Sequence, residues 1–294
     1  MITKDDFIEL IKKEYPLEFD EIINGLNVKR YETLRINNLK SNKDEIESFL
    51  NINNIDYEIS SFYKDAYIIK SNYNFYDSNL FNEGKIYLQS LSSQIPPLYL
   101  DLVDSFDILD MCAAPGGKTS LIADLTNNQK QIMAVEFNKI RAEKLKYNLN
   151  HLNAKANVIV ADASKLDSFF RFDTILLDAP CSGSGTINLC NEKDLKNFSL
   201  LLVKNSSIIQ KKLLKKAIEI LKPGHTMIYS TCSILKEENE LVLKEILNKN
   251  IVLEPININI DKSNILPSLY NEVLTIKPNE YFEGFFIAKI KKIR

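Results

Sequence analysis

The chain has 294 residues, enough for one large domain or for a large and a small one. Hydrophobic residues make up 45% of it and charged residues 26%, as in an ordinary soluble globular protein. The formal net charge of −2 argues against a large basic surface for sequence-independent binding of nucleic acid. A local basic groove can still exist on a nearly neutral molecule.

Signals for a membrane, for secretion and for a structural metal are missing from the sequence. No apolar run approaches the roughly 18–20 residues that a membrane span needs. Residues 1–6 lack the basic start and apolar core of a secretory signal. None of the four cysteines forms a Cys-x-x-Cys pair. We therefore expect a cytoplasmic protein with no membrane contact and no metal site, and by default a monomer.

Residues 1–82 are predicted to form a small α+β domain. Its helices are expected at Lys4–Lys13, Phe19–Gly25 and Ser41–Leu50, and its strands at Glu32–Asn37 and, as a pair, within Tyr57–Ser71. By analogy, a strand–helix–strand–strand order suggests a module that binds RNA on its sheet.

Residues 83–294 alternate between strands and helices. Strands are expected at Phe106–Met111, Gln131–Glu136, Asn157–Asp162, Asp173–Asp178 and His225–Thr231. Helices are expected at Thr119–Leu125, Lys139–Leu152, Ser206–Leu221 and Glu237–Asn248. Phe285 and Phe286 belong to an expected final antiparallel strand. This alternation predicts a parallel, doubly wound sheet, which binds ligands at the carboxyl ends of its strands.

The turn after the first of these strands has the composition of a ligand-binding turn. It reads Cys112, Ala113, Ala114, Pro115, Gly116, Gly117 and Lys118, followed by Thr119. Small residues let backbone amides approach a ligand beside a helix N-terminus. A phosphate-binding P-loop requires glycine at position 112, where this chain has Cys112, and the dinucleotide pattern G-x-G-x-x-G is also absent. The ligand therefore carries little or no phosphate.

Acids stand at the ends of the predicted strands. Glu136 is placed to accept both hydroxyls of a ribose, and Asp162 an adenine amino group, although Asp162 is about as well explained as a helix cap. With Asp110 and Asp178 they favour a ribose-plus-adenine ligand that carries positive charge. S-adenosylmethionine, which has a sulfonium and an ammonium group, fits this description.

Two cysteines stand at the ends of strands that are expected to be neighbours. Cys181 follows Asp178 in Asp-Ala-Pro-Cys, and Cys232 lies in Ser-Thr-Cys-Ser. Carbon 5 of cytosine attacks a sulfonium methyl only after a thiolate has added to carbon 6, so one thiol suits the attack and a second suits proton removal or product release. A protonated or hydrogen-bonding Asp178 is available to relieve charge at N3 of the ring.

These segments resemble the Sun family of RNA cytosine 5-methyltransferases. The resemblance rests on residues 110–119, 178–183 and 230–233, and extends through residues 35–37, 87–93, 237–240 and 283–286. It implies a Rossmann-like class I methyltransferase fold behind a small N-terminal α+β domain, with S-adenosylmethionine as cofactor and ribosomal or transfer RNA as substrate.

The resemblance also implies roles for individual residues. Cys232 would be the nucleophile and Cys181 would assist release, an order that spacing alone leaves open. Lys118 and Asp178 would hold the target cytosine, and Asp178 would also lie near the cofactor. The turn from Cys112 to Lys118, with Glu136, Arg141 and Asp162, would bind the cofactor.

One departure from the family concerns the loop after Gly185. The family usually has one or two arginines there, whereas this chain continues with Thr186 and Ile187, which weakens the case for RNA contacts by that loop. Two other enzyme hypotheses are a DNA cytosine methyltransferase in which Cys181 attacks and, more remotely, a nucleotide hydrolase. Outside enzymes, the alternative is an RNA-binding assembly factor with a vestigial cleft.

Overall fold

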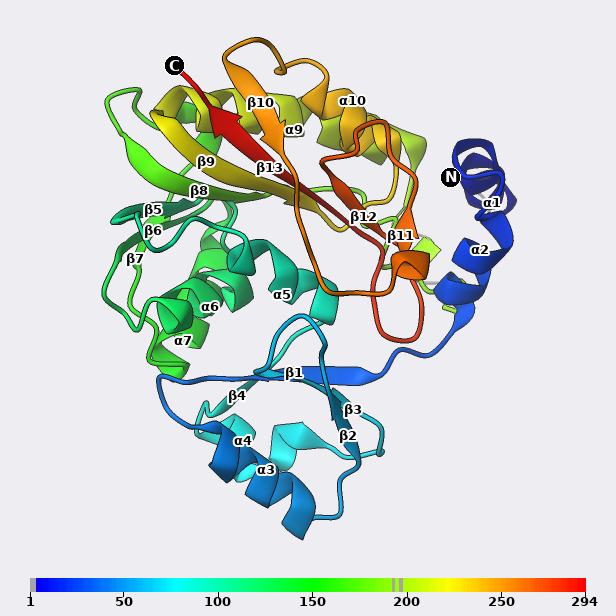
Figure 1. Cartoon of the computed structure of the whole chain (residues 1–294), viewed down its shortest axis with the longest axis vertical. Helices are drawn as coiled ribbons and strands as arrows, with labels where there is room; N and C mark the ends of the chain where they lie inside the picture. Colours follow the sequence, from blue (N-terminus) through cyan, green and yellow to red (C-terminus); the bar gives the residue numbers. More distant parts are fainter. Residues whose placement is uncertain (1–3, 192–193, 196–197) are drawn as a thin grey trace.

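The chain folds around two β-sheets, a large one and a small one (Figure 1). The structure is a computed structural model, and it describes residues 4–191, 194–195 and 198–294. The large sheet has nine strands in the order β11-β12-β13-β9-β8-β5-β6-β7, with β10 paired to β13. The small sheet has four strands in the order β2-β3-β1-β4.

The centre of the large sheet is parallel, as predicted. It consists of β5 (Asp107–Asp110), β6 (Gln131–Glu136), β7 (Asn157–Val160), β8 (Phe172–Asp178) and β9 (Leu221–Thr231). The expected final strand is β13 (Phe285–Lys292), which runs antiparallel to β9. Three short strands complete the edge: β10 (Ile251–Glu254), β11 (Ile265–Leu266) and β12 (Leu274–Ile276).

The chain leaves β5 toward β6 and β7 on one side and later returns to β8 and β9 on the other. The carboxyl ends of β5 and β8 therefore form the point at which a doubly wound sheet binds its ligand. Asp110 ends β5 and Asp178 ends β8, so both acids lie at this point.

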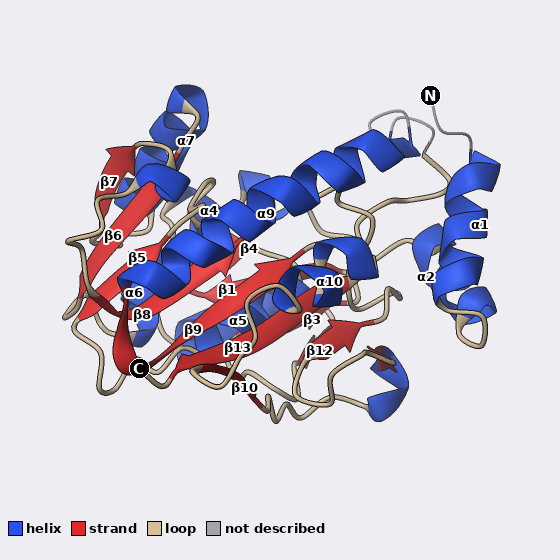
Figure 2. Cartoon of the chain, turned by 90° about the horizontal axis from the view of Figure 1, so that it is seen from above, coloured by secondary structure: helices blue, strands red, loops and turns tan. Residues whose placement is uncertain are grey.

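Helices cover both faces of the large sheet, because alternate residues of each strand point to opposite sides. Ile108 packs into a cluster with α5 (Leu91–Leu98), α6 (Gly117–Leu125) and α7 (Lys139–His151). Its neighbour Leu109 packs into a second cluster with α9 (Leu200–Ile220) and α10 (Glu240–Leu243). Figure 2 shows α9 lying across the sheet. Of the described helices, none is long and apolar enough to cross a membrane.

The small sheet is antiparallel and has its own core. It consists of β1 (Glu32–Ile36), β2 (Tyr57–Ile59), β3 (Ala66–Ile69) and β4 (Ile86–Leu88). Ile46 and Leu50 of α3 (Lys43–Ile52) and Leu80 of α4 (Asn79–Asn82) are buried in a cluster with its strands. The predicted α+β unit is therefore present, and β4 lies just past residue 82.

The first two helices pack elsewhere. In α1 (Lys4–Glu14) and α2 (Phe19–Asn27), Phe7 and Ile22 belong to a third apolar cluster. That cluster also contains Ile187 and Ile234, which follow the two cysteine-bearing strand ends, and Figure 2 shows both helices away from the small sheet. The helices thus support the loops of the large domain.

One predicted helix was wrong. The pattern at Glu237–Asn248 predicts a continuous helix, but the structure has a 3₁₀ turn at Lys236–Glu238 and then only the short α10. The break is at Asn239, whose φ of −120° and ψ of −96° are not helical. Its side chain accepts a hydrogen bond from the Thr231 hydroxyl at 2.6 Å and donates one to the Ser233 carbonyl at 2.9 Å. These tertiary contacts override the local helical pattern.

Candidate active site

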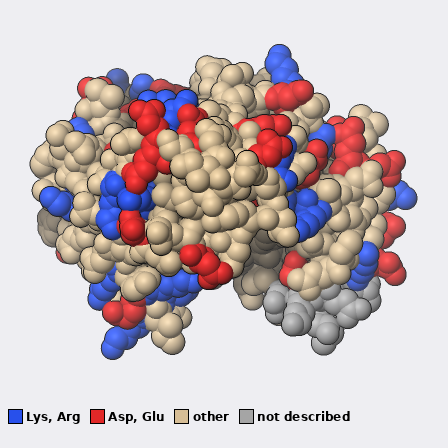
Figure 3. Space-filling view, turned by 90° about the horizontal axis from the view of Figure 1, so that it is seen from below, with Lys and Arg blue, Asp and Glu red and all other residues tan. Residues whose placement is uncertain are grey.

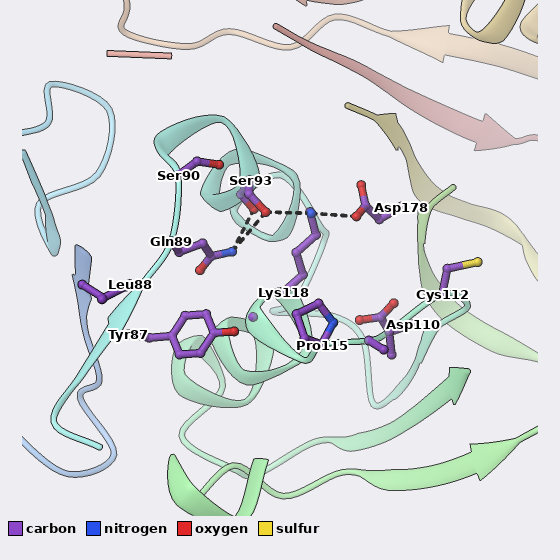
Figure 4. A pocket seen from close by; sticks show the side chains of 13 residues that line it. Tyr87, Leu88, Gln89, Ser90, Ser93, Asp110, Cys112, Pro115, Lys118 and Asp178 are labelled. Atoms are coloured by element: carbon purple, nitrogen blue, oxygen red, sulfur yellow. Dashed lines mark hydrogen bonds and ion pairs between the residues drawn. The ribbon is translucent and has the colours of Figure 1, made fainter. Parts of the chain in front are cut away.

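The turn from Cys112 to Lys118 connects β5 to α6 and forms one wall of a pocket (Figure 4). Gly116 caps the helix with a φ of +108°, a left-handed conformation that favours glycine. At Gly117, a Cβ atom would lie 2.8 Å from the ring of Tyr87. Both glycines are therefore required, one for conformation and the other for close approach.

The opposite wall of the pocket comes from residues 87–93, which join the small sheet to α5. Tyr87, Gln89 and Ser93 line it, and Figure 4 shows them facing the turn. The sequence pattern gave these residues no role, although residues 87–93 were part of the family resemblance. The pocket thus lies between the two sheets.

Asp110 lies at the bottom of this pocket and is almost fully buried. One carboxylate oxygen accepts a hydrogen bond from the Thr119 hydroxyl at 2.7 Å, whereas the other is buried without a partner. Burial, and to a smaller extent the charge of Asp178, raises the pKa of Asp110 to about 7. A buried acceptor without a donor fits a ligand that brings an ammonium group or another donor.

Lys118 and Asp178, which also line the pocket, form an ion pair. The ammonium group lies 2.7 Å from an Asp178 oxygen and also donates a hydrogen bond to the Ser93 hydroxyl at 2.8 Å. Burial lowers the pKa of Lys118, but the Asp178 carboxylate outweighs it, so the pKa is above its ordinary value. The second Asp178 oxygen accepts a hydrogen bond from Ser230 at 2.8 Å, which connects the pocket to the end of β9.

The two predicted thiols are in contact. The parallel pairing of β8 with β9 places Asp178 opposite Ser230, and the loops that follow bring Cys181 Sγ to 2.9 Å from Cys232 Sγ. The hydrogen bond to Cys232, together with burial, raises the pKa of Cys181 well above its usual value. Either sulfur can donate this hydrogen bond, so the contact by itself assigns no separate role to either thiol.

The loops that carry the thiols are tied together by backbone contacts. Gly185 N–H donates to the Cys232 carbonyl at 3.0 Å, and Gly284 N–H donates to the Gly185 carbonyl at 2.8 Å. A Cβ atom on Gly185 would lie 2.0 Å from the Gly284 oxygen. The segment around Gly284, which precedes β13, therefore packs directly on the Cys181 loop.

The remaining predicted cofactor residues lie at the ends of β6 and β7. Glu136 is buried and accepts a hydrogen bond from Asn138 N–H at 2.9 Å, and Arg141 donates to the Ala114 carbonyl at 2.8 Å. Arg141 also lies 3.7 Å from Glu136, so it connects two parts of the predicted site. Asp162 caps the short helix that follows it by accepting from Ser164 N–H at 3.0 Å, as the capping explanation requires.

Two further observations concern cysteines and metals. Cys190 is exposed, and its sulfur lies 3.6 Å from the Asn27 carbonyl oxygen. Among the described residues, no group of three or more His, Cys, Asp or Glu side chains is arranged to hold a metal ion.

This sheet order, with the glycine-containing turn from Cys112 to Lys118 after β5, defines a Rossmann-like fold of the class I methyltransferase type. The sequence pattern of 16S rRNA methyltransferase RsmB/F matches residues 97–291. The chain therefore belongs to the RsmB/F family, which is the Sun family that the motifs resemble.

Individual relatives agree with this assignment. A probable ribosomal RNA small subunit methyltransferase B from Coxiella burnetii is 34% identical over 265 residues, which cover 86% of this chain and 60% of that protein. A tRNA (cytosine(72)-C(5))-methyltransferase from Pyrococcus horikoshii is 35% identical over 218 residues, covering 73% of this chain and 54% of that protein. The chain thus spans little more than half the length of these curated relatives.

A solved structure shares nearly the whole fold. A methyltransferase homolog protein from Pyrococcus horikoshii superposes with a TM-score of 0.81 at 30% identity, covering 97% of this chain and 93% of that one. The similarity includes the small N-terminal sheet as well as the large one, because so little of either chain is left out.

Proposed function

We propose that the protein is an S-adenosylmethionine-dependent RNA cytosine 5-methyltransferase in which Cys232 attacks carbon 6 and Cys181 assists release. The observation that carries this proposal is the pair of thiols in contact at the ends of β8 and β9, beside a pocket lined by the cofactor turn. Methyl transfer to oxygen or nitrogen needs no thiol nucleophile, whereas transfer to carbon 5 of cytosine does.

Residues that line the pocket, together with Glu136, Arg141 and Asp162 outside its lining, fit the cofactor by their chemistry. S-adenosylmethionine supplies an electrophilic methyl group on a sulfonium. The unpartnered oxygen of Asp110 suits the ammonium group of the methionine part, and the carboxylate of Glu136 suits the ribose hydroxyls. The backbone from Cys112 to Lys118 would line the ligand, Arg141 would hold the turn to Glu136, and Asp162 would lie at the adenine.

The chain's own residues can move the protons that the reaction requires. Cys181 lies 2.9 Å from Cys232, so it is placed to donate a hydrogen bond to the attacking sulfur. Both oxygens of Asp178 already accept hydrogen bonds, so the donor toward the charged ring would be Lys118 and not Asp178. After methyl transfer, Cys181 stands within reach of Cys232 to take part in the removal of the carbon 5 proton and the release of the product.

The RNA substrate is proposed to be ribosomal or transfer RNA, because relatives of both kinds match the chain. We further propose that the domain predicted at residues 1–82 binds RNA through its small sheet, which extends to β4, and that residues 83–294 form the catalytic domain, against which α1 and α2 pack. On the face drawn in Figure 3, Lys and Arg side chains are interspersed with Asp and Glu, so that face does not present a field of one sign. Action as a cytoplasmic monomer remains part of the proposal.

The test uses purified protein, labelled S-adenosylmethionine and total RNA from cells that lack the enzyme. Wild type should place label in 5-methylcytidine, Cys232→Ala should abolish it, and Cys181→Ala should accumulate a covalent protein–RNA adduct on a denaturing gel. Cys190→Ala is the matched control, because its thiol is exposed and contacts the Asn27 backbone instead. An adduct in Cys232→Ala would reverse the thiol roles, and labelled DNA instead of RNA would favour the DNA methyltransferase.

A further inference from the structure

Glu238 is a completely buried acid that contacts both cysteine-bearing loops. One carboxylate oxygen accepts a hydrogen bond from the backbone N–H of Ser182 at 2.7 Å. The other accepts from the Ser182 hydroxyl at 2.5 Å and from the Ser233 hydroxyl at 2.6 Å. Ser182 directly follows Cys181 and Ser233 directly follows Cys232, so a single carboxylate joins the residues next to the two thiols.

The position of Glu238 is itself fixed from several sides. Its carbonyl accepts a hydrogen bond from the buried Tyr229 hydroxyl at 2.6 Å. The next residue, Asn239, holds Thr231 and the Ser233 carbonyl, as described above. These contacts are also what interrupts the predicted helix, so local helical structure is given up where the carboxylate is held between the loops.

Burying a carboxylate is costly unless its hydrogen bonds are satisfied. Burial raises the pKa of Glu238, and the hydrogen bonds from Ser182 and Ser233 oppose that rise. A pair of hydroxyls needs no buried acid, yet Ser233, which lies 2.8 Å from the Ser184 hydroxyl, donates its own proton to Glu238. An acid that accepts from both loops instead fixes the distance between them.

We propose that Glu238 is a positioning residue that holds Cys181 and Cys232 in contact, so that the steps requiring both thiols can follow attack by one of them. This inference rests on the proposed function for its catalytic consequence. The attack needs only the Cys232 sulfur, whereas release needs Cys181 within reach of Cys232. Weakening the hydrogen bonds by which Glu238 holds the two cysteine loops together therefore slows product release more than attack on carbon 6.

The first experiment measures thiol proximity without RNA or cofactor. In a glutathione buffer, the thiols of Cys181 and Cys232 give two electrons to glutathione disulfide, forming one protein disulfide and two molecules of glutathione. At a fixed concentration of reduced glutathione, the ratio of oxidised to reduced glutathione that half-oxidises the pair is read by trapping free thiols and mapping peptides. For Glu238→Gln, which keeps the shape but cannot accept all three hydrogen bonds, we expect the required ratio to rise by tenfold or more.

Glu240→Gln is the matched control. Glu240 is also completely buried in the same segment, but its carboxylate accepts from Ser268 and not from the cysteine loops. It should leave the glutathione ratio at the wild-type value. A Glu238→Gln protein with the wild-type ratio, or an equal change in both variants, would overturn the proposal. If Glu238→Gln does not fold, Ser182→Ala removes one hydroxyl contact and should shift the ratio in the same direction.

The second experiment follows methyl transfer to RNA. Glu238→Gln should lower kcat tenfold or more, keep the KM for RNA and the Kd for S-adenosylmethionine within twofold, and accumulate the covalent adduct seen with Cys181→Ala. A variant that loses affinity for both ligands, with no adduct, would show a merely structural role. If wild type methylates no RNA but Glu238→Gln still raises the required glutathione ratio, the positioning role of Glu238 is supported and the proposed function is wrong.

Discussion

A change at Arg35 tests how the small sheet supports the turn from Cys112 to Lys118, which is proposed to bind the cofactor. Its guanidinium is fully buried and donates hydrogen bonds to Gln89 at 2.9 Å, to the Gly117 carbonyl at 3.1 Å and to Ser120 at 2.7 Å. It also lies 3.8 Å from Asp124, whose side chain is 1% exposed. One side chain of β1 thus contacts the pocket wall, the cofactor turn and α6.

Replacing Arg35 with Met keeps the bulk of the side chain and removes the charge. Asp124 would then stay buried with hydrogen bonds only from Asn38, at 3.3 and 3.4 Å. Removing one partner of a buried ion pair typically costs about 3–5 kcal/mol of unfolding free energy, because the other charge is left uncompensated. At about 2 °C per kcal/mol for a chain of this size, the melting temperature should fall by roughly 6–10 °C.

The assay combines thermal unfolding with calorimetric titration of S-adenosylmethionine. Arg35→Met should also weaken cofactor binding, because the Gly117 carbonyl loses the Arg35 donor and keeps only the Ser120 hydroxyl as a side-chain donor. Asp124→Asn in the same chain should recover part of the stability, since the uncompensated charge is gone. Lys43→Met is the control, because Lys43 pairs with Glu47 on an exposed helix face. A melting temperature within about 1 °C of wild type and unchanged cofactor affinity would refute this reasoning.

Three further outcomes are expected. The carboxyl of Asp110 ionises near pH 7 in the folded protein but near 3.8 when unfolded, so its burial destabilises the fold increasingly as pH rises between these values. Asp110→Asn should therefore gain stability relative to wild type from pH 5 to pH 8, while binding S-adenosylmethionine more weakly; a constant difference in melting temperature would contradict this. Gly185→Ala places a Cβ 2.0 Å from the Gly284 oxygen, so the Cys181 loop must shift, with a stability loss of about 1–3 kcal/mol in urea unfolding and loss of adduct release. Lys118→Met should lower kcat/KM for RNA methylation by roughly 10²-fold, and a loss below threefold would exclude Lys118 as the donor to the ring.

Much of the fold follows from local pattern. The runs that end at Asp110, Glu136 and Asp178 are apolar because each strand is covered by helices on both faces, and they appear as β5, β6 and β8. Since all carboxyl ends of a parallel sheet meet at one edge, the sequence also predicted that Cys181 and Cys232 lie close together, and their sulfur atoms are 2.9 Å apart.

Other features have no local signal. The helix predicted at Glu237–Asn248 had a suitable pattern, but the hydrogen bonds of Asn239 with residues on β9 and its loop outweighed it. Similarly, the strand pattern around Arg35 says nothing about Gln89, which is 54 positions away, or about Gly117, which is 82 positions away. Such contacts exist only after two sheets have packed together.

The sequence by itself determined which candidate site residues follow which strand: the turn from Cys112 to Lys118, the acids at the strand ends and the two thiols. It did so because parallel strands present their ends at a common edge whatever lies around them. Only the tertiary structure decided that residues 87–93 form one wall of the pocket and that Arg35 donates a hydrogen bond to the Gly117 carbonyl. It also decided that Glu238 accepts hydrogen bonds from both cysteine loops. These arrangements depend on satisfying buried polar groups across distant segments, a requirement that no periodicity in the chain records.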